Sequence, residues 1–319
     1  MPLMKSASSV YDESPAYTII KTLCVSSLRP AVLRCTASIL HNFFFRQYRA
    51  ALLPGRVPVS RVDHPLDLKI PFVPSWVTIY LDFVMYWIRM LAFLLHTYGR
   101  RAYDATREFI VSMGRLYAFA AQSYQKNFST TDRPFYIARP RFFLIHLFDP
   151  HLMCVPSLHV MVVVWTYKNF EAILRSFNDA GRYAAQIEEM KQGALAITHA
   201  ILFIKQHSVN CIAAALYAMT RFDGELFPPE EAEAFIRQLF WEAPPEAPTG
   251  RLPANYKVRP WAAPRTKIPA GDVSIIRDHI TSLFRRFIKE GKTAREWEAP
   301  LLNFMRRHPM LWNTSAGKQ

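Results

Sequence analysis

The sequence predicts an all-α protein, a helical membrane bundle of about six helices with a C-terminal helical extension. Hydrophobic residues make up 51% of the 319 residues and aromatic residues 14%, which is enough to form one large core. Only 10 residues are glycine, which argues against a β-rich or linker-rich chain. Apolar segments of helical length recur between residues 76 and 219 and support the helical prediction.

The clearest candidate for a membrane span covers residues 76–96. It is long enough to cross a bilayer, and its charged residues Asp82 and Arg89 are expected to face protein or water. Residues 31–45 form a weaker first span. The other apolar segments are shorter than the roughly 20 residues that a spanning helix needs, so buried core helices fit them equally well. These segments cover residues 109–121, 160–167, 194–204 and 209–219.

With about six spans, both termini lie inside, and the polar motifs described below lie on the outer face of a plasma or inner membrane. Basic residues in segments 100–107 and 168–191 then fall on the cytoplasmic side, as the positive-inside rule prefers. The basic residues between 46 and 69 would lie outside, against that bias. Residues 1–14 lack an apolar core, so no cleavable signal peptide is expected.

The chain is basic, with 39 Lys and Arg residues against 25 Asp and Glu residues and a net charge of +14. This charge favours anionic partners, and no nucleic-acid-binding signature accompanies it, so a membrane is expected as partner and a nucleic acid is not. The mean hydropathy is only +0.01, unlike that of a uniformly apolar transporter. The four cysteines show no paired spacing, so neither a zinc site nor a disulfide framework is predicted, and no cofactor is expected.

Composition divides the chain into an N-terminal region with the possible first span (1–70), a helical core (71–221) and a basic extension (222–319). The extension begins with an acidic helix candidate at 228–241 and continues with a proline-rich stretch at 244–269. An amphipathic basic helix follows, which is expected to pack against the protein's own core; the alternative is an anionic membrane surface. Its apolar residues are Val273, Ile276, Ile280, Leu283, Phe284, Phe287 and Ile288.

Three short polar strings in the middle of the chain carry residues that are suited to chemistry. Phosphoryl transfer needs a nucleophile, a proton donor for the leaving group and several cations around the phosphate. The strings supply two histidines, two lysines, an arginine and a serine, and they require no metal ligands. They are Lys126 with Arg133-Pro134, then Pro156-Ser157-Leu158-His159, then Lys205-Gln206-His207-Ser208.

In order and residue types, the strings resemble the motifs of the type 2 phosphatidic acid phosphatase superfamily over roughly residues 71–221. The first string matches the family's Lys, six residues, Arg-Pro at its spacing. The second matches Pro-Ser-Gly-His, with Leu158 where glycine is commonest, a form similar to the inositolphosphotransferase-like branch. In the third string, His207 takes the place of the family's histidine.

The resemblance implies a metal-independent lipid phosphate phosphatase that acts through a phosphohistidine intermediate. Its substrate would be a lipid phosphate or pyrophosphate. An unperturbed histidine titrates near 6.5, so one imidazole can attack while a second donates a proton near neutral pH. His207 would be the nucleophile and His159 the proton donor, and Lys126, Arg133, Ser157 and Lys205 would hold the phosphate.

The third string departs from the family pattern. Ala200 and Ile201 stand where the family has Ser-Arg, and Cys211 stands where it has the aspartate that orients the histidine. Loss of an orienting aspartate costs about 10⁴ in turnover in serine proteases. Lys205 could replace the arginine as a point charge, and Asn210, on the same helical face as His207, could accept the ring N–H as a catalytic residue.

Each string also has a structural explanation. Lys126 and Arg133 fit ordinary surface charge, Ser157 fits a helix cap, and segment 205–207 fits a polar kink between apolar stretches. Three alternatives to the phosphatase hypothesis therefore stay open. They are a lipid phosphotransferase of the same superfamily, a catalytically inactive lipid-binding membrane scaffold, and a soluble helical protein with a basic interaction tail.

Overall fold

The computed structural model describes residues 9–53, 55–138, 140–240 and 268–309. Most of these residues are helical, which confirms the all-α prediction. The only strands within these ranges, β1 (Val59–Arg61) and β2 (Phe128–Thr130), are short and pair in parallel, with Val59 opposite Phe128.

The N-terminal region forms helices rather than an isolated tail. The first described residues of this region dock on the core, since the Val10 N–H donates to a Glu189 carboxylate oxygen at 2.9 Å. Three helices follow, and a π-helical turn at Leu40–Phe45 joins the second to the third. They are α1 (Pro15–Cys24), α2 (Arg29–Ile39) and α3 (Arg46–Leu52).

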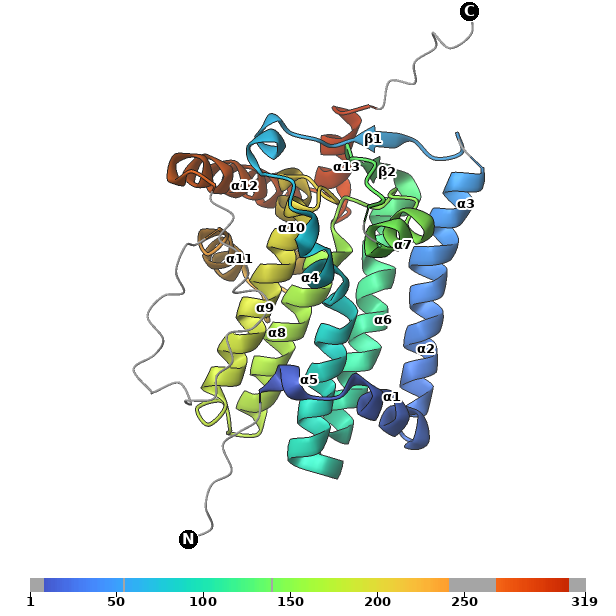
Figure 1. Ribbon diagram of the computed structural model, residues 1–319, viewed down its shortest axis with the longest axis vertical. Helices are drawn as coiled ribbons and strands as arrows, with labels where there is room; N and C mark the ends of the chain where they lie inside the picture. The colour runs from blue at the N-terminus through green and yellow to red at the C-terminus, as the bar shows by residue number, and fades with distance from the viewer. Residues whose placement is uncertain (1–8, 54, 139, 241–267, 310–319) are drawn as a thin grey trace, which may run out of the picture.

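The long helices of the core run along the long axis of the molecule, and both strands lie at one end of it together with the last helix (Figure 1). Their apolar residues, which cover one face of some helices and most sides of others, favour burial among other helices. The core consists of α4 (Val77–Leu81), α5 (Phe83–Tyr98), α6 (Tyr103–Lys126), α7 (Pro140–Phe148), α8 (Leu158–Ser176), α9 (Ala184–Phe203) and α10 (Val209–Phe222).

Helix α8 is at the centre of the bundle, where it contacts α5, α6, α9 and α10. Its residues from Val160 to Val164 are all buried, so the segment expected at 160–167 as a possible span is enclosed by protein. The segments at 194–204 and 209–219 are buried almost as completely in α9 and α10. Burial among other helices is compatible with both expectations for these three segments, since inner helices of a membrane bundle are enclosed by protein as well.

Within the described residues, one helical run, Pro74–Lys126, is long and apolar enough to cross a membrane. It contains the segment 76–96 that the sequence singled out. A second span results only if Pro15–Cys24 and Arg29–Leu52, which are bent by 115°, count as one. By length and composition these helices give fewer spans than the sequence suggested.

The extension packs on the core through α11 (Pro229–Arg237), α12 (Ala270–Gly291) and α13 (Ala299–Arg306). As expected, α12 is amphipathic and turns its apolar face toward the protein, where it contacts α10, α11 and α13. The proline-rich stretch at 244–269 lies almost entirely outside the described residues. One continuous hydrophobic cluster includes residues from Val10 to Met305, so the three sequence regions share a single core.

Truncation of the buried face of α12 should destabilise the whole protein. Ile280 is fully buried, whereas Ile275 on the same helix is 50% exposed. We expect Ile280→Ala to lower the free energy of unfolding by about 2–5 kcal/mol and Ile275→Ala by less than about 0.5 kcal/mol, as measured by denaturant titration. Equal effects would show that this face of α12 is not packed on the core.

Candidate functional site

The second and third strings meet where α8 and α10 begin. His159 lies in the first turn of α8, and His207 lies in the turn between α9 and α10. His207 Nε2 is 3.3 Å from His159 Nδ1 and 3.3 Å from Ser157 Oγ. All three side chains belong to buried residues. The structure thus brings together three of the residues that the sequence selected.

The backbone of the α9–α10 turn sets the position of His207. Lys205 adopts a left-handed conformation with φ of 56°, and the N–H groups of Gln206 and His207 both donate to the Ile201 carbonyl. A left-handed residue with such back-bonding is a common way to end a helix. Helix α10 then starts immediately, because Ser208 Oγ accepts a hydrogen bond from the Asn210 N–H at 3.3 Å. The turn is therefore a kink between apolar stretches, and it carries His207 into the interior.

Ser157 stands at the N-cap position of α8 but does not cap the helix with its side chain. Its hydroxyl points to His207 Nε2 instead. A serine at this position normally stabilises the helix by accepting a main-chain N–H. The structural explanation of Ser157 as a helix cap is therefore wrong for the side chain.

His207 is held as a neutral imidazole. Burial lowers its pKa to about 3, and the nearby Cys154 main chain opposes this effect in part. Its Nδ1 is buried and forms no hydrogen bond of normal geometry with the described residues. A neutral ring with Nε2 directed at other polar groups has the lone pair that nucleophilic attack requires.

Aromatic rings enclose His159. Its ring centroid lies 4.5 Å from that of Tyr80 and 4.4 Å from that of Phe83. His159 Nδ1 and His207 Nε2 face each other. When both rings are neutral, a hydrogen bond between these two nitrogens requires a proton on one of them and a lone pair on the other. If the proton sits on His159 Nδ1, His207 Nε2 is the acceptor, which is the tautomer that a nucleophilic His207 needs.

Arg133 is linked to this pair through Gln206, and its Nη1 also lies 4.0 Å from an Asp149 carboxylate oxygen. Its Nη1 donates to Gln206 Oε1 at 3.2 Å, and its Nη2 donates to the Asp149 carbonyl at 3.2 Å. Gln206 directly precedes His207, and the Arg133 side chain is only 15% exposed. A guanidinium is suited to phosphate because it donates in a planar fork.

Lys126, the other cation of the first string, is engaged elsewhere. Its ammonium forms ion pairs with Glu296 and Glu298 of the C-terminal extension, the latter at 2.6 Å. The Glu298 side chain is only 5% exposed. Nearby, the Trp297 ring stacks on Phe119 at 4.0 Å. The structure therefore gives Lys126 a role in docking the extension and does not direct it to the histidines.

Lys205 and Asn210 also differ from expectation. The Lys205 ammonium donates to the main-chain carbonyls of Asp67 and Ile70, and burial lowers its pKa while Asp67 raises it. Asn210 Nδ2 donates to the Val62 carbonyl at 3.0 Å, and Asn210 Oδ1 lies 2.8 Å from His279 Nε2. The amide of Asn210 is thus occupied by partners other than His207, so it does not replace the missing aspartate.

The sequence did not single out His151, which lies beside the cluster. Its ring centroid is 6.3 Å from that of His207, and its Nε2 is 2.8 Å from Thr131 Oγ1. Burial and the charge of Arg133 hold the pKa of His151 well below its ordinary value. The only signal was the polar run Asp149-Pro150-His151, which ends five residues before Pro156 and whose spacing matches none of the three strings.

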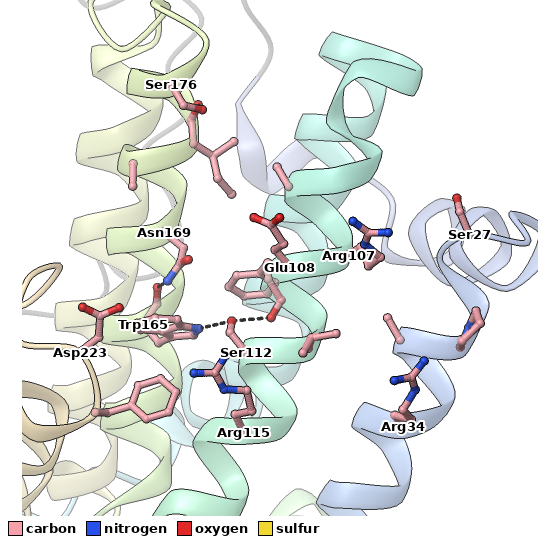
Figure 2. Close-up of a pocket in the computed structure, with 18 residues that line it drawn as sticks. Ser27, Arg34, Arg107, Glu108, Ser112, Arg115, Trp165, Asn169, Ser176 and Asp223 are labelled. Atoms are coloured by element: carbon pink, nitrogen blue, oxygen red, sulfur yellow. Dashed lines mark hydrogen bonds between the residues drawn. The ribbon is translucent and has the colours of Figure 1, made fainter.

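A cavity of about 800 Å³ lies away from the histidine cluster. It is bounded by α2, α6, the part of α8 from Trp165 onward and the end of α10, and its lining carries arginines and carboxylates together with the Trp165–Ser112 hydrogen bond (Figure 2). None of the residues selected from the sequence lines it. This cavity is therefore separate from the candidate site.

Comparisons with protein-family models, curated proteins and solved structures found no match for this chain. The functional assignment therefore depends on the residues and their geometry. The geometry that matters most is the contact of His207 Nε2 with Ser157 and His159, with Arg133 bound to the adjacent Gln206.

Removal of the Lys126 ammonium should leave Glu298 buried without its cation. We expect Lys126→Met to lower the free energy of unfolding by about 1–2 kcal/mol. Lys69→Met is a matched control because Lys69 is equally exposed at 43% but pairs with the more exposed Asp272. The control should cost less than about 1 kcal/mol. A larger loss for Lys69→Met in denaturant titrations would contradict the anchoring role of Lys126.

Stability should fall as the pH is lowered from about 6.5 toward 3, because the folded-state pKa of His207 lies below that of the unfolded chain. The unfolded chain therefore binds the proton first, and acid favours unfolding. Each such histidine contributes a slope of up to about 1.4 kcal/mol per pH unit in this window. Urea titrations at pH 7, 6 and 5 should show a shallower slope for His207→Gln than for the wild type. Parallel slopes would show that His207 is not buried as a neutral ring.

Proposed function

We propose that this protein is a metal-independent phosphatase that acts on a lipid phosphate or pyrophosphate through a phosphohistidine intermediate. The observation that carries the proposal is the contact of His207 Nε2 with both His159 Nδ1 and Ser157 Oγ. Arg133, adjacent through Gln206, supplies a cation. This combination supports the chemistry that the sequence strings predicted.

In the first step, His207 Nε2 attacks phosphorus and the bond from phosphorus to the leaving oxygen breaks. For this step His159 must be the imidazolium, a form that the negative charge of a bound phosphate favours. Its Nδ1 then gives a proton to that oxygen and the ring becomes neutral, so the leaving group departs as an alcohol or as a protonated phosphate. Arg133 and the Ser157 hydroxyl stabilise the charge on the phosphoryl oxygens. Because Nε2 already contacts His159 and Ser157, an entering phosphate must displace at least one of these contacts.

In the second step, water attacks phosphorus and releases His207, while His159 takes the proton from the water. If another alcohol enters instead of water, the same site becomes a lipid phosphotransferase. The two activities share every residue named here and differ in the acceptor. Product analysis with an added alcohol separates them.

A catalytically inactive, lipid-binding scaffold is the second candidate, and specific observations favour it. Lys126 and Lys205 are bound by groups of the protein rather than facing the histidine pair. His207 Nδ1 has no carboxylate partner among the described residues, so the ring lacks the support that an aspartate would give. An active enzyme with this site would have a modest turnover.

We further propose that the protein is membrane-bound, with the run Pro74–Lys126 as its principal span. Large apolar side chains that remain exposed on several helices support this proposal, because exposed apolar patches commonly mark a contact with membrane or protein. In the extended version of this proposal, about six helices of the bundle cross the membrane. Extraction by carbonate without detergent would instead favour the soluble alternative. The exposed side chains include Ile19, Ile20 and Leu23 of α1, Leu33 of α2, and Phe143, Leu144 and Leu147 of α7.

Phosphate release from a panel of lipid phosphates and pyrophosphates tests the proposal. We expect His159→Ala to lose about 10²–10⁴ in turnover, as for a general acid, and His207→Ala to lose at least about 10³. His96→Ala, an exposed histidine at the far end of α5, is the control and should keep wild-type turnover.

A labelled substrate adds an independent readout. After denaturation, wild-type protein should carry an acid-labile label on histidine, and His207→Ala should carry none. Turnover that survives in His207→Ala would contradict the mechanism. A wild type that is inactive on the whole panel but binds lipid phosphates would favour the scaffold.

A further inference from the structure

A second cavity, of about 760 Å³, is lined mainly by residues 41–59, which precede the region that resembles a phosphatase, and by five residues between 125 and 152 within that region. Its size is within the roughly 300–1,000 Å³ that is typical of sites for small ligands. It is enclosed by the end of the π-helical turn and α3, by β1 and β2, and by residues 150–152. Its apolar lining includes Phe45, Ala50, Val57, Phe128 and Leu152.

The charged residues that line this cavity are all arginines, namely Arg46, Arg49 and Arg56. Among the described residues, no carboxylate pairs with any of them. Arg46 Nε is buried, and no described residue forms a hydrogen bond with it. A buried guanidinium nitrogen without a partner is costly, so a bound anion would stabilise Arg46, and the exposed Arg49 and Arg56 could donate to the same anion.

The other cavity shows that this lining is unusual for the molecule. There, Arg34, Arg107 and Arg115 share the space with Glu108 and Asp223, so the charges are nearly balanced (Figure 2). The cavity beside α3 has no carboxylate in its lining. It therefore combines an apolar interior with unbalanced positive charge.

The position of the cavity makes it accessible to an amphiphile. Leu52 and Phe44, which neighbour the lining residues in sequence, are exposed apolar side chains. On its inner side, the cavity is bounded by Thr130 and Leu152. Leu152 is next to His151, which lies beside His207. Solvent or membrane thus lies on one side of the cavity and the histidine cluster on the other.

We propose that this cavity binds an anionic amphiphile, with its hydrocarbon chain against Phe45, Val57 and Phe128 and its head group on the arginines. An apolar lining selects for a chain, and arginines without carboxylates select for a negative head group. The ligand class is that of the proposed substrate, but the site is separate from the histidines. The inference therefore holds whether or not the protein is a phosphatase.

Photolabelling of the full-length protein in a neutral detergent tests the inference. The probe is dodecyl phosphate with a diazirine in its chain, and a diazirine-bearing dodecyl maltoside is the neutral counterpart. We expect the phosphate probe to label peptides that contain residues 45–59, 128 and 152, and the neutral probe to label them about tenfold less. His207→Ala should be labelled as strongly as the wild type, which separates binding from turnover.

Arg49→Gln/Arg56→Gln should reduce labelling by about tenfold or more, because it removes two guanidinium groups that would bind the anionic head group. Both side chains are exposed, so the change should leave the fold intact. Arg34→Gln/Arg115→Gln, from the other cavity, is the matched control and should leave labelling unchanged. Equal labelling by both probes, or no loss in Arg49→Gln/Arg56→Gln, would overturn the inference. Complete competition by millimolar inorganic phosphate would also overturn it, because the site would then take a free anion rather than an amphiphile.

Discussion

The position of His207, and with it the candidate site, depends on hydrogen bonds between residues 64–70 and the turn that joins α9 to α10. Asp67 Oδ1 accepts the N–H of Val209 at 2.9 Å, at the start of α10, while Asp67 Oδ2 accepts the N–H of His64 at 2.8 Å. From the other direction, the Lys205 ammonium binds the carbonyls of residues 67 and 70. A carboxylate at a helix N-terminus is favourable because the first N–H groups lack partners. The Asp67 carboxylate and the Lys205 ammonium thus hold together the end of α9, the start of α10 and the segment that precedes α4.

The extension completes the same end of the molecule. His279 of α12 contacts Asn210 and stacks on His64 with ring centroids 3.8 Å apart. Ser60 Oγ of β1 donates to the Met305 carbonyl in α13 at 2.8 Å. Residues that are hundreds of positions apart in sequence are therefore neighbours around the site. Since α12 and α13 also contribute Ile280 and Met305 to the single hydrophobic cluster, the extension is part of the structure that holds the histidines.

The sequence predicted the all-α fold from its apolar helical segments, and it predicted a joint site for His159 and His207 because their strings resemble superfamily motifs that form one site. It did not predict which cations face them. Lys126 pairs with carboxylates 170 and 172 positions away, and such contacts leave no local pattern. The amphipathic pattern of α12 correctly indicated core packing. Burial of α8 to α10 was harder to foresee, since an apolar stretch fits lipid and protein equally well.

The ion pairs between Lys126 and the extension make the docking of the C-terminal part of the chain sensitive to anions that bind Lys126. An anion that binds the Lys126 ammonium must compete with Glu296 and Glu298, and those carboxylates lie next to α13. Anion binding there and docking of the extension are consequently coupled equilibria. By reciprocity, each weakens the other by the same factor, so the occupancy of one is a measure of the other.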